Sequence, residues 1–226
     1  DLIFLSSSRV YSINKLNLIK LSKKKIKSKI KIDETFGNES PISLYGFTKL
    51  SSEMLIKEYS YMYNLNYIIN RFGVISGPWQ FGKVDQGFVA LWVARHLNKK
   101  NLSYIGYGGQ GNQIRDIIHI NDACEIILNQ IKKIKSIKNK TFNIGGGPQN
   151  ALSLKQLTEK CEKITNNKIS ILKKKNTSNF DIPYYVTNNR KISNYYNWKP
   201  KYKLNHIIKD IYDWLKNNKS IMENYF

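Results

Sequence analysis

Short apolar runs alternate with longer segments of helical periodicity along this chain. The first run, "DLIFLSSS", ends in small hydroxyl residues and is typical of a buried strand whose carboxyl end opens into a site. Similar runs are "NYIINRFGVISGP", "LSYI", "IRDIIHI" and "KTFNI", with a short one at 168–173. Each of these runs predicts a strand.

The first segment between these runs predicts a long helix. Ser40 and Pro41 have the residue types of an N-cap and of a first helical position, so a helix is expected over about 41–63. Its apolar positions include Leu50, Met54 and Leu55.

Later segments predict further helices. "FVALWVARHL" has the pattern of an amphipathic helix, Asn121 begins another that runs to about 135, and Ser153 has the position of a cap before "LKQLTEKCEKIT". Two helical stretches fill 188–218, whereas residues 12–39 are polar, basic and poorly periodic and are expected to form a long loop.

Strands that alternate with helices predict an α/β protein with a mostly parallel sheet. Ligands of such sheets lie beyond the carboxyl ends of the strands. The segments "SSS", "SGP" and "IGGG" all fall at such ends, so one cleft is expected to collect them.

Composition narrows the class of protein. The chain has 226 residues, of which 41% are hydrophobic, which is enough for a sizeable core. No apolar run reaches the ~18 residues of a membrane span, so no membrane partner is expected. Cys124 and Cys161 lie in helical patterns and are interpreted as buried thiols of a reducing compartment, which predicts a cytoplasmic protein. No pattern predicts a metal site.

The charge of the chain is strongly positive. Lys and Arg number 37 against 16 Asp and Glu, a formal net charge of +21. A strongly positive surface can bind nucleic acid. The excess is mostly lysine spread along the chain, densest in "KLSKKKIKSKIK" at 20–31, so we interpret it as solvated surface and expect no nucleic-acid partner. It can still steer anionic substrates.

Tyr45 and Lys49 are the candidate proton-transfer pair. They stand at i and i+4 and therefore share one face of the predicted helix. A nearby ammonium favours the phenolate and lowers a tyrosine pKa, so such a tyrosine can take a proton from a substrate hydroxyl. Ser7, at the end of the first strand, could hold the same oxygen. The alternative is a solvated lysine beside a half-buried tyrosine.

The order of several motifs resembles one enzyme family over essentially the whole chain. "SSSRVY", "YGFTK", "RFGVISGP", "IRDIIHINDA", "FNIGGG" and "WKP" follow one another as in the extended short-chain dehydrogenase/reductases, specifically the NAD-dependent nucleotide-sugar epimerases and dehydratases. Within that family, the segment from "GPWQFGKVDQGF" to "QIRDIIHI" is most similar to the CDP-paratose 2-epimerases.

The resemblance implies a fold, a cofactor and a reaction. The fold would be the C-terminal part of a Rossmann-like doubly wound parallel sheet with an interleaved smaller α/β substrate lobe. Residues 1–78 would belong to the NAD-binding domain and 79–226 mainly to the substrate lobe, with about 113–147 returning to the first domain. The implied reaction is epimerisation of a nucleotide sugar, CDP-paratose to CDP-tyvelose, by transient oxidation with NAD. Family members commonly pair through the long Tyr/Lys helix, which implies a homo-oligomer.

The resemblance also implies roles for individual residues. Tyr45 would be the general acid and base, Lys49 would tune it and bind the nicotinamide ribose, and Ser7 would hydrogen-bond the reacting hydroxyl. The implied cofactor contacts also include Ser6, Phe72, Gly73 and Val74. The implied substrate contacts are Ser8, Gln80, Asp85, Gln86 and Arg115, the last at the diphosphate.

Alternatives to these roles stay open. Ser7 could satisfy a strand end, Arg115 could pair with Asp116 or Asp122, and Asp85 could cap the next helix. His119 is expected to hold the local fold. Val74 stands where many relatives carry asparagine, so a substrate contact common in the family is lost or moved.

The largest departure from the family is the glycine motif. "GYGGQG" at 106–111 lies between two predicted strands and is interpreted as a turn. A dinucleotide-binding half has about three βα units of roughly 30 residues each. The resemblance therefore implies about a hundred residues before Asp1, and the fragment alone is expected to be inactive.

Two other functions remain possible from the sequence. One is a nucleotide-sugar 4,6-dehydratase or reductase, but dehydratases of this family carry an acidic pair where this chain has Ser8 and Arg9. The other is a non-catalytic nucleotide-binding remnant.

Overall fold

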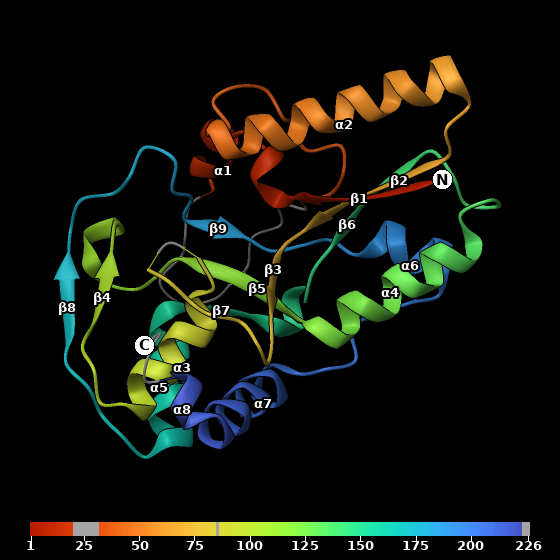
Figure 1. Ribbon diagram of the computed structural model, residues 1–226. Helices are drawn as coiled ribbons and strands as arrows, with labels where there is room; N and C mark the ends of the chain where they lie inside the picture. The colour runs from red at the N-terminus through yellow and green to blue at the C-terminus, as the bar shows by residue number, and fades with distance from the viewer. Residues whose placement is uncertain (20–31, 85, 223–226) are drawn as a thin grey trace.

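The computed structural model describes residues 1–19, 32–84 and 86–222 of the chain (Figure 1). The basic run at 20–31 and the predicted substrate residue Asp85 lie outside this part. The described residues form a mixed α/β structure whose strands are mostly parallel. The predicted α/β class is therefore confirmed. None of the helices in the described ranges is long and apolar enough to cross a membrane.

The first sheet carries the strand ends that the sequence marks. Its strands are β1 (Leu2–Ser7), β2 (Tyr67–Phe72) and β6 (Lys140–Ile144), parallel and in the order β1-β2-β6. Ser7 lies opposite Phe72, and Phe72 lies opposite Ile144, so the carboxyl ends of the strands stand side by side.

Helices cover both faces of this sheet. Figure 1 shows α2 (Leu44–Tyr63) above it, and α4 (Ile120–Lys133) and α6 (Arg190–Tyr196) below it. The apolar core on the side of α4 and α6 includes Ile126 and Ile192, packed with buried strand residues such as Phe142.

Two further groups of strands lie beyond the first sheet. In one, β5 (Ile114–His119) pairs in parallel with β3 (Val74–Ser76) and β9 (Tyr184–Tyr185) and antiparallel with β7 (Ala151–Ser153). In the other, β4 (Leu102–Ile105) pairs in parallel with β8 (Ile171–Lys174).

The remaining helices and turns complete the described chain. Helices α3 (Phe88–Leu97), α5 (Leu154–Thr165) and α7 (Leu204–Asn217) pack together around one core cluster, as the lower part of Figure 1 shows. The short elements are α1 (Ile13–Asn17), α8 (Lys219–Met222), η1 (Ser8–Val10), η2 (Tyr107–Gly109) and η3 (Pro148–Asn150). The predicted turn at 106–111 contains η2 and joins β4 to β5, as expected.

The predicted strand "NYIINRFGVISGP" is divided at Gly73. Its first half, β2, belongs to the first sheet, and its second half, β3, pairs with β5. The amide of Gly73 donates to Ile144 O at 2.8 Å, and a Cβ on Gly73 would lie 3.0 Å from Thr187 Oγ1. The chain therefore changes sheets at a crowded position that suits glycine.

The predicted start and apolar face of α2 are wrong. The N-cap is Ser43, whose Oγ accepts a hydrogen bond from Gly46 N at 3.2 Å, rather than Ser40. Met54 and Leu55 are exposed, whereas Glu53 is buried. The helix turns a polar face inward because Glu53 has a charged partner there, described below.

Other expectations also need correction. The segment 12–19 is not loop: Ile13, Leu16 and Ile19 share one side of α1 and its end, and they are buried in a cluster with Tyr11 and Tyr185. Helix α3 is buried on nearly all sides rather than amphipathic, because α5 and α7 pack against it in the same core.

The cysteines agree with the prediction in part. Cys161 is buried as expected, but Cys124 is exposed, and both are free thiols. The predicted domain division after residue 78 stays a prediction.

Candidate active site

Helix α2 is fastened to β1 and η1 at successive turns of one face. A Cβ on Gly46 would lie 2.2 Å from Arg9 O, so α2 approaches the backbone of η1 directly. One turn later, Lys49 Nζ donates to Leu5 O at 2.9 Å, and one turn further, Glu53 Oε1 accepts from Ser6 Oγ at 2.5 Å. This face of α2 fixes the helix against the end of β1, where Ser7 lies.

A buried ion pair lies under this contact. Arg71 of β2 donates to Glu53 through Nε at 3.0 Å and through Nη2 at 2.7 Å, and both side chains are almost fully buried. A paired guanidinium and carboxylate of this geometry give a strong, directional contact. The pair therefore sets the position of α2 relative to the sheet.

The network continues from Arg71 to the residue that follows η1. Arg71 Nη1 donates to Tyr11 Oη at 3.2 Å, and Tyr11 Oη donates to Asn143 Oδ1 at 2.6 Å. Burial raises the pKa of Tyr11 to about 12, so this phenol keeps its proton and stays a donor at neutral pH. The contacts of α2 and the hydrogen bonds of Tyr11 thus hold the segment that carries Ser7, Ser8 and Arg9.

Ser7 keeps its hydroxyl proton available. Its Oγ accepts a hydrogen bond from Arg9 N at 3.1 Å as the cap of η1. A hydroxyl that accepts in this way can still donate its own proton. Ser7 therefore both satisfies the strand end and offers a donor to a ligand.

Tyr45 and Lys49 lie in the first turns of α2, beside the end of β1. The Tyr45 side chain is 54% exposed, and neither residue belongs to the lining of the cleft described next. The Lys49 ammonium lies 5.0 Å from the centre of the Phe4 ring and bonds to Leu5 O. The structure thus brings both residues next to β1, while their catalytic roles stay predictions.

A cleft of about 660 Å³ opens at the end of β1. Ser7, Ser8 and Arg9 line it on the side of β1 and η1, together with Gly73 and Val74. Its other walls are mostly apolar and come from α3, β4 and β8, through Phe88, Leu91, Trp92, Leu102, Ile105 and Leu172. An apolar cleft with a few convergent polar groups is the usual form of a small-molecule site.

Arg115 is the most enclosed charge of the cleft. It donates to Ile114 O at 2.8 Å, to Ile182 O at 2.7 Å and to Asp181 Oδ1 at 3.2 Å. Burial lowers the pKa of Arg115 to about 10, against the opposing effect of Asp181, so the guanidinium remains charged at neutral pH. The predicted alternative of a pairing with an aspartate is thus present, but with Asp181 rather than with Asp116 or Asp122.

A residue that lines the cleft, Gln113, also carries a buried amide acceptor. Gln113 donates from Nε2 to Ile105 O at 2.6 Å, while its Oε1 is buried without a protein partner in the described chain. A buried acceptor without a partner is costly and suits a ligand or water that donates to it.

Several predicted site residues lie elsewhere. The Ser6 hydroxyl donates to Glu53, and Phe72 is buried in the core below the sheet, so neither side chain lines the cleft. Gln80 bonds to Ser76 and to Ile75 O and holds its own loop, and Gln86 is exposed outside the lining.

Sequence reasoning missed Arg9, Gln113 and Asp181. The position of Arg9, directly after "SSS", was a usable signal, because residues that follow the carboxyl end of a strand commonly line the same site. Nothing local marks Asp181, since its loop reaches the cleft through contacts with residues far away in the sequence.

His119 holds the local fold, as predicted. Its Nδ1 accepts from Asn121 N at 3.1 Å as the cap of α4, and its ring stacks on Tyr202 with the ring centres 4.2 Å apart. His119 Nε2 also lies 3.3 Å from Asp210 Oδ2.

Comparison with known proteins identifies the family. The model of the "NAD dependent epimerase/dehydratase family" matches residues 1–145. The chain belongs to this family. It is 28% identical over 174 residues to a CDP-paratose 2-epimerase of Salmonella typhi, an alignment that covers 76% of this chain and 51% of that protein.

Solved structures of epimerases and dehydratases share the fold of this epimerase-family chain. UDP-glucose 4-epimerase with UDP-glucose from Thermotoga maritima gives a TM-score of 0.77 at 24% identity, covering 96% of this chain and 63% of that one. dTDP-glucose 4,6-dehydratase of Bacillus anthracis in complex with NAD gives 0.78 at 23% identity, covering 100% and 64%. The chain thus spans about half the length of the curated relative and under two thirds of these structures.

Proposed function

We propose that the intact protein is an NAD-dependent nucleotide-sugar epimerase that works by transient oxidation of a sugar hydroxyl. The observation that carries this proposal is the fastening of the Tyr45-Lys49 turns of α2 against the end of β1, where Ser7 opens into the cleft. The proposal assigns Tyr45, Lys49 and Ser7 the roles of proton acceptor, cation and hydroxyl donor, the groups that this chemistry needs.

The residues near the end of β1 suit the nicotinamide end of NAD. Lys49 donates one hydrogen bond to Leu5 O and has further N–H groups for ribose hydroxyls, Tyr45 is exposed on the same helix, and Gly73 has no side chain to block a ring at the cleft. These residues and Val74 would hold the nicotinamide ribose. The described residues include no glycine-rich turn that leads from a strand into a long helix and would hold the pyrophosphate.

In the proposed reaction, Tyr45 is the acceptor and later the donor of the transferred proton. NAD, when bound, would supply the acceptor and later the donor of a hydride. Ser7 donates a hydrogen bond to the reacting sugar oxygen, and Tyr45 takes the hydroxyl proton as the alcohol becomes a ketone. Lys49 stabilises the phenolate of Tyr45. After the keto-sugar has turned, Tyr45 returns the proton and the alcohol forms with inverted configuration.

We propose CDP-paratose as the substrate and CDP-tyvelose as the product, with inversion at C2. The similarity to a CDP-paratose 2-epimerase supports this choice. Arg9 supports it too, since elimination in a 4,6-dehydratase calls for acidic groups next to the catalytic hydroxyl. A dehydratase or reductase remains the alternative of the same class, and a non-catalytic nucleotide-binding remnant remains the alternative of another class.

We also infer a cytoplasmic homo-oligomer. Apolar side chains gather on the outer face of α2, where Phe47, Leu55 and Tyr59 are exposed along one stripe. A large exposed apolar face on a helix is typical of an interface. A second copy of the same helix would cover it in an isologous pair.

The decisive experiment compares the native full-length protein with its Tyr45→Phe variant. With NAD+ and CDP-paratose, the wild type is expected to form CDP-tyvelose, as measured by NMR of the sugar protons. Loss of a general acid-base group lowers turnover by roughly 10²–10⁴-fold. Tyr61→Phe, on the exposed surface of the same helix, is the matched control and keeps wild-type turnover.

Other outcomes contradict distinct parts of the proposal. Wild-type turnover in Tyr45→Phe would remove Tyr45 as the base. Solvent deuterium at the sugar C5 would indicate dehydration. Calorimetric binding of CDP without any binding of NAD would favour the non-catalytic remnant.

A further inference from the structure

Arg9 lines the cleft two residues after Ser7 and reaches its far wall. Its Nη1 donates to Phe180 O at 3.1 Å, across a separation of 171 residues. The other N–H groups of this guanidinium have no protein partner in the described part of the chain, and none of the ion pairs there involves Arg9. Arg9 is therefore a cation in the cleft that lacks an anionic partner.

Arg9 and Arg115 bond to consecutive residues of one loop. Arg9 bonds to Phe180, and Arg115 bonds to the next two residues, Asp181 and Ile182. All three loop residues line the cleft. The positive charge of Arg9 also acts on Arg115, whose pKa it helps to lower after the larger effect of burial. The two guanidinium groups are therefore close enough to repel each other.

The charges of the cleft are not balanced by the protein. Its described lining has four basic residues, Arg9, Arg95, Arg115 and Lys174, against one acidic residue, Asp181. Asp181 is already engaged by Arg115. A ligand with more than one negative charge would remove the repulsion between Arg9 and Arg115.

We propose that Arg9 binds the sugar-linked phosphate of the substrate diphosphate, while Arg115 holds the diphosphate from the other side. This inference rests on the proposed function and names a substrate contact of the same site. A guanidinium is suited to it because its planar N–H groups match the oxygens of a phosphate. Since Arg9 follows Ser7 so closely, its contact with the phosphate would also fix the distance between the diphosphate and the reacting hydroxyl.

A structural role is the competing explanation. The bond to Phe180 O could serve to hold the loop at 178–182 in place. Loss of such a tie would weaken every ligand of the cleft alike, whereas loss of a phosphate contact depends on how many phosphates the ligand has. The number of phosphates therefore separates the two explanations.

The test measures binding of three cytosine ligands, CDP, CMP and cytidine, to the native full-length protein by calorimetry. UDP, UMP and uridine repeat the series, so that the result does not depend on the base. The variants are Arg9→Gln, which removes the charge, and Arg9→Lys, which keeps it but loses the planar fork. Arg190→Gln, an exposed arginine at the start of α6, is the matched control.

Arg9→Gln is expected to weaken CDP or UDP roughly tenfold to a hundredfold, the loss that a charged hydrogen bond typically brings. Binding of the monophosphates and nucleosides should change by less than about threefold, and Arg9→Lys should lie between wild type and Arg9→Gln. The control should match the wild type.

Two results would overturn the proposal. An equal loss for diphosphates, monophosphates and nucleosides would assign Arg9 to the loop alone, and unchanged CDP and UDP affinity would remove it from the site; either result leaves the proposed function standing. A wild-type protein that binds none of the nucleotides would overturn both proposals together. Circular dichroism of Arg9→Gln checks that the fold is kept.

Discussion

Gly46 lies against the carbonyl of Arg9 so closely that an added Cβ would be 2.2 Å from Arg9 O. This contact joins the first turn of α2, which carries Tyr45, to the turn that directly follows Ser7. The distance between the candidate base and the candidate hydroxyl donor is therefore set by a backbone contact that tolerates no side chain.

Gly46→Ala is expected to push α2 away from η1, because the obstacle, Arg9 O, is a backbone atom and cannot rotate aside. Overpacking of this kind costs about 1–3 kcal/mol of unfolding free energy. We expect that loss in urea denaturation, together with a fall in epimerase turnover. Lys57→Ala, at an exposed residue of the same helix, should leave both measurements near wild type. Unchanged turnover in Gly46→Ala would mean that the contact does not position the site.

Glu53→Gln is expected to destabilise the protein strongly. The substitution keeps the shape of the side chain but leaves the Arg71 guanidinium buried without a counter-charge. Breaking one side of a buried ion pair costs about 3–5 kcal/mol. Chemical denaturation measures this loss, and Glu58→Gln, exposed on the same helix, is the control.

A double substitution that replaces both partners of the ion pair separates its effect on stability from its effect on turnover. In Glu53→Leu with Arg71→Met, neither partner is left as an unpaired buried charge, so part of the stability should return relative to Glu53→Gln. Turnover should stay low even so, because Ser6 loses the acceptor Glu53 and Tyr11 loses the donor Arg71. If turnover returned together with stability, the pair would have no role in positioning.

Stability is expected to fall as the pH drops from 7 toward 5. Burial lowers the pKa of His96 and of His119 below the ordinary histidine value of about 6.5. In that range the unfolded chain binds protons that the folded chain does not, so acid favours unfolding. Urea denaturation between pH 5 and 7.5 measures the slope.

His96→Gln isolates one part of this slope. Its free energy of unfolding should depend less on pH than that of the wild type, whatever its absolute stability. An unchanged slope in His96→Gln would contradict the assignment.

Leu55→Lys is expected to separate the proposed oligomer. The side chain is 59% exposed on the outer face of α2, so the change has little effect on the folded protomer but places a charge in the proposed interface. Sedimentation velocity should show a smaller species than the wild type. Lys132→Ala, at the exposed end of α4, is the control. A wild-type protein that is already monomeric would contradict the interface.

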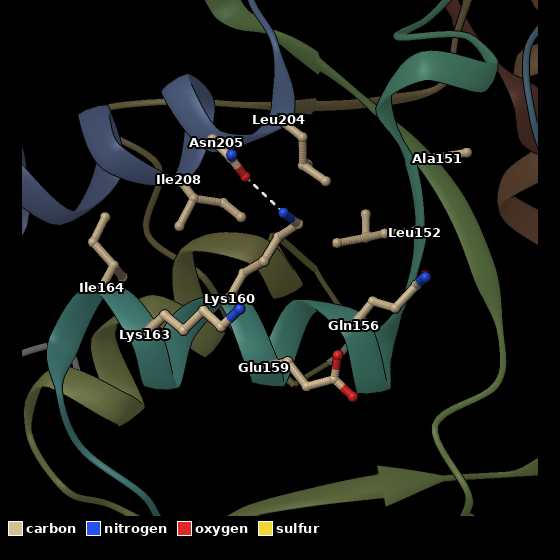
Figure 2. Close-up of a pocket in the computed structure, with 10 residues that line it drawn as sticks. All are labelled: Ala151, Leu152, Gln156, Glu159, Lys160, Lys163, Ile164, Leu204, Asn205 and Ile208. Atoms are coloured by element: carbon tan, nitrogen blue, oxygen red, sulfur yellow. Dashed lines mark hydrogen bonds between the residues drawn. The ribbon is translucent and has the colours of Figure 1, made fainter.

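A second pocket, which shares Leu152 with the cleft, supports no such prediction. It lies between α5 and α7, where Lys160 Nζ bonds to Asn205 Oδ1 at 2.6 Å, and Figure 2 shows that these two side chains point toward each other. Because this lysine already has a partner and the buried residues Leu152, Leu204 and Ile208 of the lining belong to the core between the helices, the pocket is best described as a gap between two packed helices.

The amino-acid sequence by itself determined the local elements and the chemistry at their ends. Apolar runs with small residues at one end predicted β1 and β6, and the spacing of Tyr45 and Lys49 placed both on one face of α2, because these patterns depend on neighbours a few residues away. The order of the motifs also identified the family.

Only the tertiary structure decided which distant residues contact these elements. It buried Glu53 against Arg71, divided the strand at Gly73, and brought Asp181 to Arg115 and Phe180 to Arg9 across 66 and 171 residues. The physical reason is that burial and charge pairing are settled by contacts between distant segments. An apolar stripe on α2 could thus remain outside while a carboxylate with a guanidinium partner was buried.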